Sequence, residues 1–346
     1  MRVALIAPPF IPVPPREYGG TELFIGHLAE ELQRQGVQVV VYTNGESTLG
    51  VEKRWVFERS QWPIRNQEYA QLKDLEHTSW AVADAARDCD ILHVNTAQGL
   101  VLSRFVQKPL VYTIHHTKDA QLSEYYSRFA DVNFVCISHF QCDGEPMARK
   151  RTIHHGIKLS DYKLLTNKQQ YLSFIGRIAP IKGTHLAIEI AKQSGVPLKI
   201  AGEVQPAYRD YFEAKVKPQI DGKFIEYVGR ADLAAKNELL GNSLAMLFPI
   251  QWDEPFGLVM VEAMACGTPV LALRGGSVPE VVEEGVSGFV RRAAKDLAKC
   301  IERLPLPAEP IRDYVEKNFS LEGMARDYLR LYEEVLQGGE RVQPAA

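Results

Sequence analysis

Short apolar runs alternate with helical patterns along almost the whole chain. Residues 3–7 form the first run, and apolar residues at helical spacing follow in 23–32 until Gly36, a residue that commonly ends helices. Further apolar runs predict strands at residues 37–42, 90–94, 109–114 and 132–137, most of them separated by helical patterns at 66–87, 97–106 and 121–129. This alternation predicts a parallel sheet wrapped by helices.

The alternation of strand and helix patterns is interrupted at residues 155–170, which are polar and lack sustained periodicity, and then resumes. The second series of apolar runs predicts strands at residues 171–176, 197–202, 224–229, 244–249 and 269–273. We therefore expect two doubly wound, Rossmann-like α/β domains that face each other across a cleft. Ligands of open parallel sheets bind beyond the carboxyl ends of the strands, which makes that cleft the expected site.

The C-terminal region predicts an amphipathic helix over residues 321–336, with one apolar face that must pack against a domain. We expect this helix to cross back to the first domain, the alternative being that it covers the second. The predicted division is a first domain over 1–165, a second domain over 166–318 and the crossing helix within 319–346.

Composition narrows the class of protein further. Of the 346 residues, 46% are hydrophobic and 24% charged, and the net charge of −3 does not indicate a nucleic-acid partner. The five cysteines form no CxxC pair, which argues against a zinc site or a disulfide framework. No run approaches the roughly 20 apolar residues of a membrane-spanning helix, and the first run is too short for a signal peptide. We expect a cytoplasmic protein, with peripheral membrane contact left open.

Two glycine-containing loops follow predicted strands. In REYGGTELF, Gly19 and Gly20 let the backbone approach a ligand beside free helix N–H groups, although a plain turn is the alternative. In FIGRIAPIKGTHLA, Gly176 ends a strand, Arg177 follows, and Lys182 precedes a helix. A fork-shaped cation and a point charge beside a helix terminus suit a diphosphate, the alternative being solvated surface charge. Neither loop has the GxGxxG or GxxxxGK[ST] pattern.

The stretch EPFGLVMVEAMACGTPV carries two glutamates among apolar and small residues. We predict a helix from Gly257 onward, so that Glu254 lies in the preceding loop and Glu262 about five residues into the helix. A carboxylate can accept hydrogen bonds from vicinal hydroxyls of a sugar or a ribose. The first N–H groups of the helix, from Gly257, Leu258 and Val259, suit an anion. The alternative for Glu262 is a structural ion pair with a nearby Arg or Lys.

Two pairs of histidines also lie near predicted strand ends. In TIHHT, which follows the strand PLVYTI, either His115 or His116 should point toward the site, unless the residue is simply packed. His154 and His155 have no accompanying carboxylates that would make a metal centre, and no metal is expected.

These motifs together resemble one family. The chain resembles the large retaining nucleotide-sugar glycosyltransferases of the GT-B fold, in particular the fourth sequence family (glycosyl transferases group 1). The resemblance runs nearly end to end and rests on YGG, TIHH, HHGI, FIGRIAPIKG, YVG, EPFGLVMVE with the following AMACGTPV, and GGSVPEVV. The E-x7-E element is the most specific of them. Two features depart from the family: HHGIK stands where an Asn-Gly-Ile-Asp-like element is usual, and 346 residues is short.

The resemblance implies a role for each candidate residue. Arg177 and Lys182 would hold the donor diphosphate and neutralise the charge on the departing nucleotide. Glu254 would hold the hydroxyls of the donor sugar, and Glu262 those of the ribose. His115 aligns best with the catalytic-cleft histidine of the family, with His116 as the second choice. The remaining implied donor contacts are at Gly19, Gly20, Gly176, Val228, Gly229, Phe256, Gly257, Leu258 and Val259.

The expected activity follows from this resemblance. We expect a retaining, metal-independent glycosyltransferase that moves a hexose-type sugar from a nucleoside diphosphate, with a UDP- or GDP-sugar as donor and no other cofactor. The acceptor hydroxyl belongs to a saccharide, a lipid or a small molecule, which the sequence does not decide. The rival hypotheses are a nucleotide-sugar epimerase of the same architecture and a catalytically silent nucleotide-sugar-binding protein.

Overall fold

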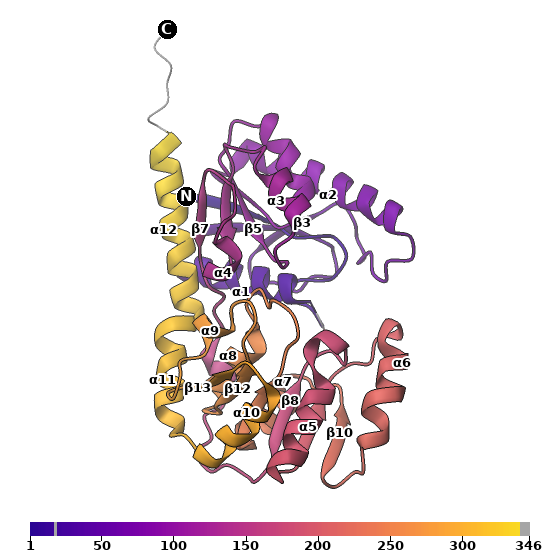
Figure 1. Cartoon of the computed structure of the whole chain (residues 1–346). Helices are drawn as coiled ribbons and strands as arrows, with labels where there is room; N and C mark the ends of the chain where they lie inside the picture. The colour runs from indigo at the N-terminus through magenta and orange to yellow at the C-terminus, as the bar shows by residue number, and fades with distance from the viewer. Residues whose placement is uncertain (17–18, 340–346) are drawn as a thin grey trace. The chain divides into compact units, whose positions relative to one another are not determined.

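The computed structural model describes residues 1–16 and 19–339 and divides the chain into two compact α/β units (Figure 1). Unit 1 comprises Met1–Gly156 and the C-terminal segment from Leu321, and unit 2 comprises Ile157–Ser320. The boundary lies earlier than the predicted 165/166 because Ile157 forms a parallel bridge with Ser320 and donates from its backbone N–H to the carbonyl of Phe319 at 2.9 Å. This pairing ties the first residue of unit 2 to its last helix.

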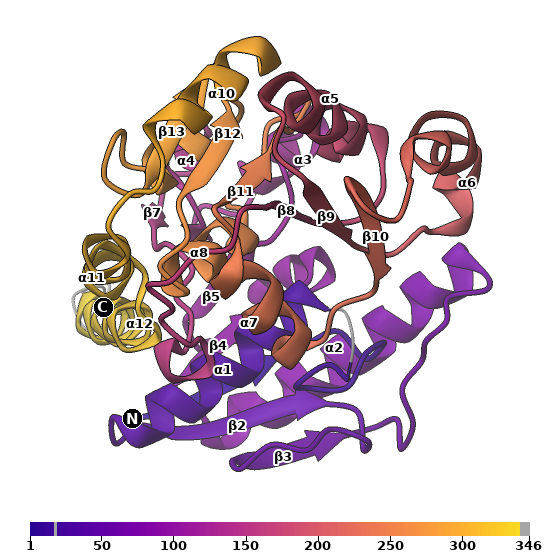
Figure 2. The ribbon, with the colours of Figure 1, turned by 90° about the horizontal axis from the view of Figure 1, so that it is seen from below.

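Unit 1 is built on a seven-stranded parallel sheet of order β3-β2-β1-β4-β5-β6-β7. Alternate residues of β1 enter two separate cores, Val3 and Leu5 on one face and Ala4 and Ile6 on the other. Figure 2 shows β2 and β3 side by side, in agreement with their pairing. The strands are β1 (Arg2–Ile6), β2 (Gln38–Thr43), β3 (Glu52–Trp55), β4 (Ile91–Val94), β5 (Leu110–Ile114), β6 (Asn133–Cys136) and β7 (Lys150–Thr152).

Helices cover both faces of this sheet. The first and last helices lie on the face that carries Val3 and Leu5, and the second and third lie on the other face. These helices are α1 (Gly20–Arg34), α2 (Gln67–Asp88), α3 (Ala120–Tyr126), α4 (His139–Cys142) and α12 (Leu321–Gly339), with a 3-10 helix at Ala97–Arg104.

The last helix, α12, belongs to unit 1 and packs against α1. The apolar face expected from the sequence is the buried one, since Leu321, Met324, Tyr328, Leu331 and Tyr332 all enter the core beneath β1 and β2. The burial of large apolar and aromatic side chains, at roughly 25 cal/mol per Å², stabilises this docking.

Unit 2 repeats the architecture with a six-stranded parallel sheet of order β10-β9-β8-β11-β12-β13. Its strands are β8 (Leu172–Ile175), β9 (Leu198–Ala201), β10 (Ile225–Gly229), β11 (Ala245–Phe248), β12 (Val270–Leu273) and β13 (Gly288–Arg291). Its helices are α5 (Thr184–Ser194), α6 (Arg209–Tyr211), α7 (Leu233–Asn242), α8 (Leu258–Ala265), α9 (Val278–Val281), α10 (Ala294–Cys300) and α11 (Ala308–Phe319).

Three strands escaped the sequence prediction. They are β3, β7 and β13, and each lies at the edge of its sheet. The first two are polar and exposed on at least part of their length, EKRW and KRT, because an edge strand pairs on one side only. Short polar strands carry no apolar run by which to recognise them.

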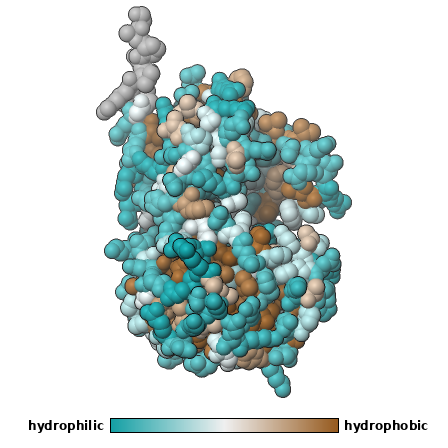
Figure 3. All heavy atoms as spheres, viewed as in Figure 1, coloured by the Kyte–Doolittle hydropathy of each residue, from teal (hydrophilic) through white to brown (hydrophobic). Residues whose placement is uncertain are grey.

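The surface is largely polar on the face drawn in Figure 3, where hydrophilic residues cover most of each unit. Among the helices of the described chain, none is both long and apolar enough to cross a bilayer.

Candidate functional site

In unit 2, the loops that carry the predicted residues leave the carboxyl ends of neighbouring strands. Chain order along the sheet reverses between β8 and β11, which are hydrogen-bonded neighbours. Arg177 and Lys182 follow β8, and Glu254 follows β11. A reversal of this kind opens a crevice beyond the strand ends, where doubly wound folds bind their ligands.

Lys182 and Glu254 form a direct ion pair in this region. Nζ of Lys182 lies 2.5 Å from Oε2 of Glu254, and the two side chains are only 15% and 8% exposed. Trp252 completes the group, because its Nε1–H donates to the same carboxylate oxygen at 2.9 Å and its ring lies 4.7 Å from Nζ of Lys182. The structure thus brings together two residues that the sequence places 72 positions apart.

Glycine at position 183 makes this approach sterically allowed. Gly183 has a left-handed backbone (φ +73°), and a Cβ atom there would lie 1.9 Å from the carbonyl oxygen of Pro249. The backbone N–H of Gln251 also donates to the carbonyl of Ile181 at 2.8 Å. The loop after β8 and the loop after β11 are therefore held in contact, with Lys182 and Glu254 adjacent.

The motif GGSVPEVV supports the same loop from the other side. Ser277 donates from its backbone to the carbonyl of Glu254 and from its hydroxyl to the carbonyl of Phe256, both at 2.9 Å. At Gly276 (φ +56°), a Cβ atom would lie 2.2 Å from the carbonyl oxygen of Glu254. Part of this family motif therefore fixes the backbone that carries the first glutamate.

Arg177 is half-buried beside Gly176. Among the described residues, no hydrogen bond or ion pair of its side chain is present, so this cation remains available to an anion. The backbone of Gly202 lies close to that of Gly176, because a Cβ atom at Gly202 would lie only 1.9 Å from the Gly176 carbonyl oxygen. Arg177 and the Lys182–Glu254 pair thus occupy one loop system at the strand ends.

Glu262 is the fifth residue of α8 and is buried. Nζ of Lys236 lies 2.9 Å from both of its carboxylate oxygens, and the Tyr162 hydroxyl donates to one of them at 3.0 Å. Burial and the Glu262 charge raise the pKa of Tyr162, which keeps this hydroxyl protonated as a donor. The ion pair considered as the alternative for Glu262 is therefore present in the structure.

The start of α8 matches the predicted arrangement. Glu254 lies in the loop, Phe256 is buried against Phe319, and Gly257 (φ +84°) precedes the first helical residue, Leu258. Leu258 and Val259 are half-buried, as expected for the exposed first turn of a helix that is otherwise in the core.

The strand β10 ends at Val228 and Gly229, where the carboxyl ends of the parallel strands of unit 2 lie. Val228 is 42% exposed, and Gly229 has φ +79° and accepts a backbone hydrogen bond from Gly202 at 2.8 Å. The exposed valine and the left-handed glycine show that the end of β10 lies at the surface of unit 2.

In unit 1, Gly20 is the first residue of α1 and Gly19 immediately precedes it. A Cβ atom at Gly20 would meet nothing within 4 Å, whereas one at Gly19 would lie 2.8 Å from a carboxylate oxygen of Glu22. Tyr18 of the YGG motif lies outside the described residues. The two glycines thus occupy the predicted turn between β1 and α1.

The two candidate histidines differ in how their ring nitrogens are used. Nδ1 of His116 lies 2.6 Å from the carbonyl of Thr117, and its Nε2 lies 2.7 Å from the Tyr126 hydroxyl. His115 has a single hydrogen-bond partner among the described residues, Oδ1 of Asn95, at 2.8 Å from Nε2. A nitrogen of His115, and none of His116, is therefore left for a ligand.

Sequence reasoning missed several partners of the predicted residues, among them Trp252, Lys236, Tyr162 and Asn95. Trp252 lies two positions before Glu254 in QWDEP, so its proximity was visible in the sequence. Lys236 and Asn95 lie 26 and 20 positions from the residues they contact, and nothing in their local sequence marks them.

Comparison with known proteins places this geometry in a class. The two parallel sheets flanked by helices have the two-domain α/β GT-B architecture. The chain is similar to sucrose-phosphate synthase from Thermosynechococcus elongatus (TM-score 0.81, 19% identity, covering 97% of this chain and 99% of that one). It is also similar to the Anabaena protein HepE solved in complex with UDP-glucose (TM-score 0.71, 19% identity, 96% and 100% coverage).

Family matches make the assignment specific. Residues 18–159 match the family described as Glycosyltransferase Family 4, and residues 158–318 match Glycosyl transferases group 1. A glycosyltransferase of Methanocaldococcus jannaschii is 26% identical over 71% of this chain and 76% of its own length. Spore coat protein SA of Bacillus subtilis is 21% identical over 96% of this chain and its full length. The chain belongs to the group 1 glycosyltransferases, and the predicted family and fold class are confirmed.

Proposed function

We propose that the protein is a retaining glycosyltransferase that transfers a hexose-type sugar from a UDP- or GDP-sugar to an acceptor hydroxyl without a metal ion. One observation carries the proposal: the buried Lys182–Glu254 pair and Arg177, a cation without a polar partner among the described residues, lie in the loops that follow β8 and β11 at the chain reversal. In a nucleotide sugar, the diphosphate is bonded to the anomeric carbon, so its negative charge lies close to the hydroxyls of the sugar. The carboxylate of Glu254, for the hydroxyls, and the cation of Lys182, for the diphosphate, lie 2.5 Å apart and match that arrangement.

The chemistry of the departing group explains the two cations. As the glycosidic bond breaks, negative charge grows on the nucleoside diphosphate, and Arg177 and Lys182 neutralise it without reorganisation. Glu254 accepts hydrogen bonds from sugar hydroxyls, and Trp252 holds its carboxylate in place. The acceptor attacks from the face that the diphosphate leaves, which gives retention and requires no assigned enzymic nucleophile.

The nucleoside would extend along the same edge of unit 2. Glu262 accepts the ribose hydroxyls, with Lys236 and Tyr162 fixing its orientation. The backbone at Val228 and Gly229 lies beside the base. Support for a uridine nucleotide comes from the similar fold of HepE, which was solved with UDP-glucose.

Unit 1 would supply the acceptor side. Gly19 and Gly20 offer backbone groups to the donor phosphate, and His115 contributes a ring nitrogen to the bound sugar. The acceptor hydroxyl belongs to a saccharide, a lipid or a small molecule.

A panel of nucleotide sugars tests the proposal. Each donor is screened by thermal shift, since a ligand of the native state raises its stability, and binders are then assayed for transfer or hydrolysis. NMR of the product reports the anomeric configuration, and EDTA tests metal independence. Conversion of the donor sugar without transfer would indicate the epimerase, and binding without any turnover the silent binding protein. An inverted product would contradict the retaining mechanism.

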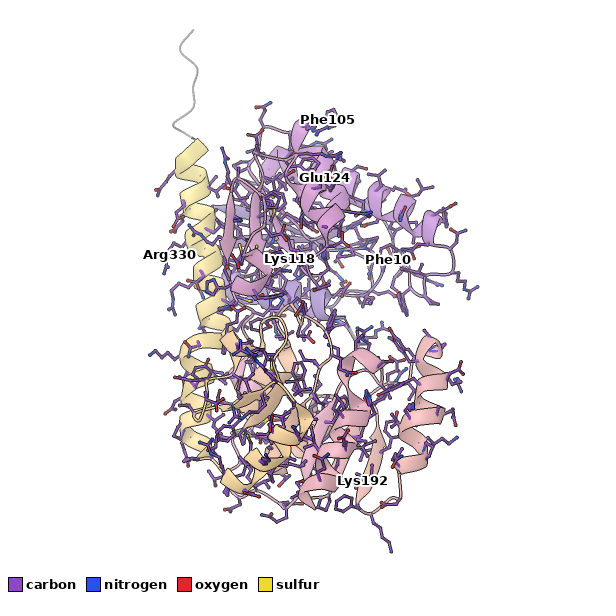
Figure 4. The ribbon with its side chains drawn as sticks, in the orientation of Figure 1. Phe10, Phe105, Lys118, Glu124, Lys192 and Arg330 are labelled. Atoms are coloured by element: carbon purple, nitrogen blue, oxygen red, sulfur yellow. The ribbon has the colours of Figure 1, made fainter. Side chains whose placement is uncertain are left out.

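Variants test the roles of individual residues. Arg177→Ala and Lys182→Ala should each lower kcat by about 10²–10³, the usual effect of losing one charge-stabilising group. Lys192→Ala is the matched control, because Lys192 lies in the last turn of α5, about 12 Å along the helix from its start, and is labelled at the lower end of unit 2 in Figure 4. Glu254→Gln with undiminished turnover would contradict the role of Glu254.

A further inference from the structure

Asn95 holds His115 in a geometry that fixes which atom of the ring carries its proton. Asn95 follows β4, and its Nδ2 donates to the carbonyl of Ile6 at 3.1 Å. Only the amino group of an amide can donate to a carbonyl, so the Oδ1 atom must face the other way, toward His115. Nε2 of His115 lies 2.8 Å from that oxygen. Because Oδ1 has no proton, Nε2 must be the donor.

The ring of His115 is neutral in this setting. Burial, followed by the neighbouring His155, His93 and His116, lowers the pKa of His115 well below its ordinary value. These three histidines are the titratable groups that act electrostatically on the ring among the described residues. A neutral imidazole with its proton on Nε2 has a lone pair on Nδ1.

The plane of the ring is also set by its neighbours. His155 stacks on it with centroids 5.9 Å apart and planes inclined by 9°, and Phe24 of α1 meets it edge-on at 5.0 Å. His115 nevertheless keeps part of its surface accessible. Among the described residues, Nδ1 has no hydrogen-bond partner, so its lone pair is directed from a fixed ring toward whatever ligand binds at this strand end.

We propose that Asn95 is a positioning residue that holds His115 as the Nε2–H tautomer, so that Nδ1 accepts a hydrogen bond from one hydroxyl of the bound sugar. The inference rests on the proposed function, since it assigns a role toward the donor sugar. It adds a selection rule: the site requires a hydroxyl that donates at that position. A group that only accepts, such as fluorine, does not replace it.

The tautomer is measured first, in the free protein and without any substrate. Nitrogen-15 NMR of histidine-labelled protein at pH 7.5 should show His115 neutral with its proton on Nε2. In Asn95→Leu, the Nδ1–H form should become populated, because the partner that selects the tautomer is gone. A proton on Nδ1 in the wild-type protein, or an imidazolium, would overturn the proposal whatever the substrate proves to be.

The selection rule is measured next, with donors in which each sugar hydroxyl in turn is replaced by fluorine. At one position the wild-type enzyme should lose about tenfold in kcat/KM, the effect of a single net hydrogen bond. That penalty should vanish in His115→Ala and shrink in Asn95→Leu. Equal penalties in all three enzymes would overturn the proposal and leave the transferase intact. If no nucleotide sugar is turned over at all, the proposed function fails instead.

Asn95→Asp separates positioning from mere structural support. The carboxylate still accepts from Nε2–H, but its charge raises the pKa of His115, so that lowering the pH protonates Nδ1 and removes its lone pair. The variant should match wild type at high pH and lose activity at a higher pH than wild type as the pH falls. Asn133→Asp, at the start of β6, should leave the profile unchanged. A profile of Asn95→Asp that coincides with wild type would contradict the inference.

Discussion

Replacing Lys182 by methionine tests whether the ion pair at the candidate site stabilises unit 2. The Glu254 side chain is 8% exposed, so the variant leaves a carboxylate buried without its cation. Removing one partner of a buried pair costs about 3–5 kcal/mol. The Trp252 N–H still donates to the carboxylate, which favours the lower end of this range, about 3 kcal/mol. Glu254→Gln should cost only about 1 kcal/mol, because the 15% exposed ammonium of Lys182 can turn toward water.

The double variant makes the reasoning testable. Lys182→Met combined with Glu254→Gln removes both charges, so it should be more stable than Lys182→Met alone by about 2 kcal/mol. Calorimetric scans without donor measure the transition of unit 2 in all four proteins. The claim that the pair is buried and coupled would be refuted if Lys182→Met had the melting temperature of wild type. It would also be refuted if the double variant were no more stable than Lys182→Met.

Three further outcomes follow from particular residues. Gly183→Ala should destabilise unit 2 by more than about 2 kcal/mol in denaturant unfolding, because the methyl group would meet the carbonyl of Pro249. Burial raises the pKa of Asp74 to about 6, so Asp74→Asn should stabilise the protein by up to about 3 kcal/mol at pH 7 and by nothing near pH 3.5. The pKa of Cys142 is lowered to about 7, because hydrogen bonds with the Cys136 thiol and Thr152 and the charge of Lys150 outweigh burial. Iodoacetamide should therefore label Cys142 before the other cysteines, which peptide mass spectrometry would measure.

The sign of the Asp74 effect follows from linkage. The carboxyl loses its proton more readily in the unfolded chain than in the folded one, so stability falls as the pH rises from the unfolded pKa, near 3.8, to about 6. The penalty is constant above that range. Equal melting temperatures of wild type and Asp74→Asn at pH 7 would contradict the claim that burial raises the pKa of this carboxyl in spite of the hydrogen bond it accepts from Thr78.

The fold was predictable because its signals are local. Buried parallel strands read as apolar runs and the helices between them as amphipathic patterns, so β1, β8, β11 and the apolar face of α12 were all visible in the sequence. The edge strands β3 and β7 were not, since a strand paired on one side needs few apolar residues, and β13 (GFVR) was missed because its two apolar residues make too short a run. The positions of the candidate residues within their loops were also predictable, because each loop carries its own motif.

The sequence by itself determined that Glu254 lies in a loop and Glu262 in the helix after it, because turn residues and helical periodicity act over a few positions. Only the tertiary structure decided which groups these acids meet. Glu254 pairs with Lys182 and Glu262 with Lys236, across 72 and 26 positions. The same holds for His115, whose proton is placed by Asn95 on a neighbouring strand end. Such contacts depend on the order in which strands assemble into a sheet, and that order leaves no mark at the contacting residues themselves.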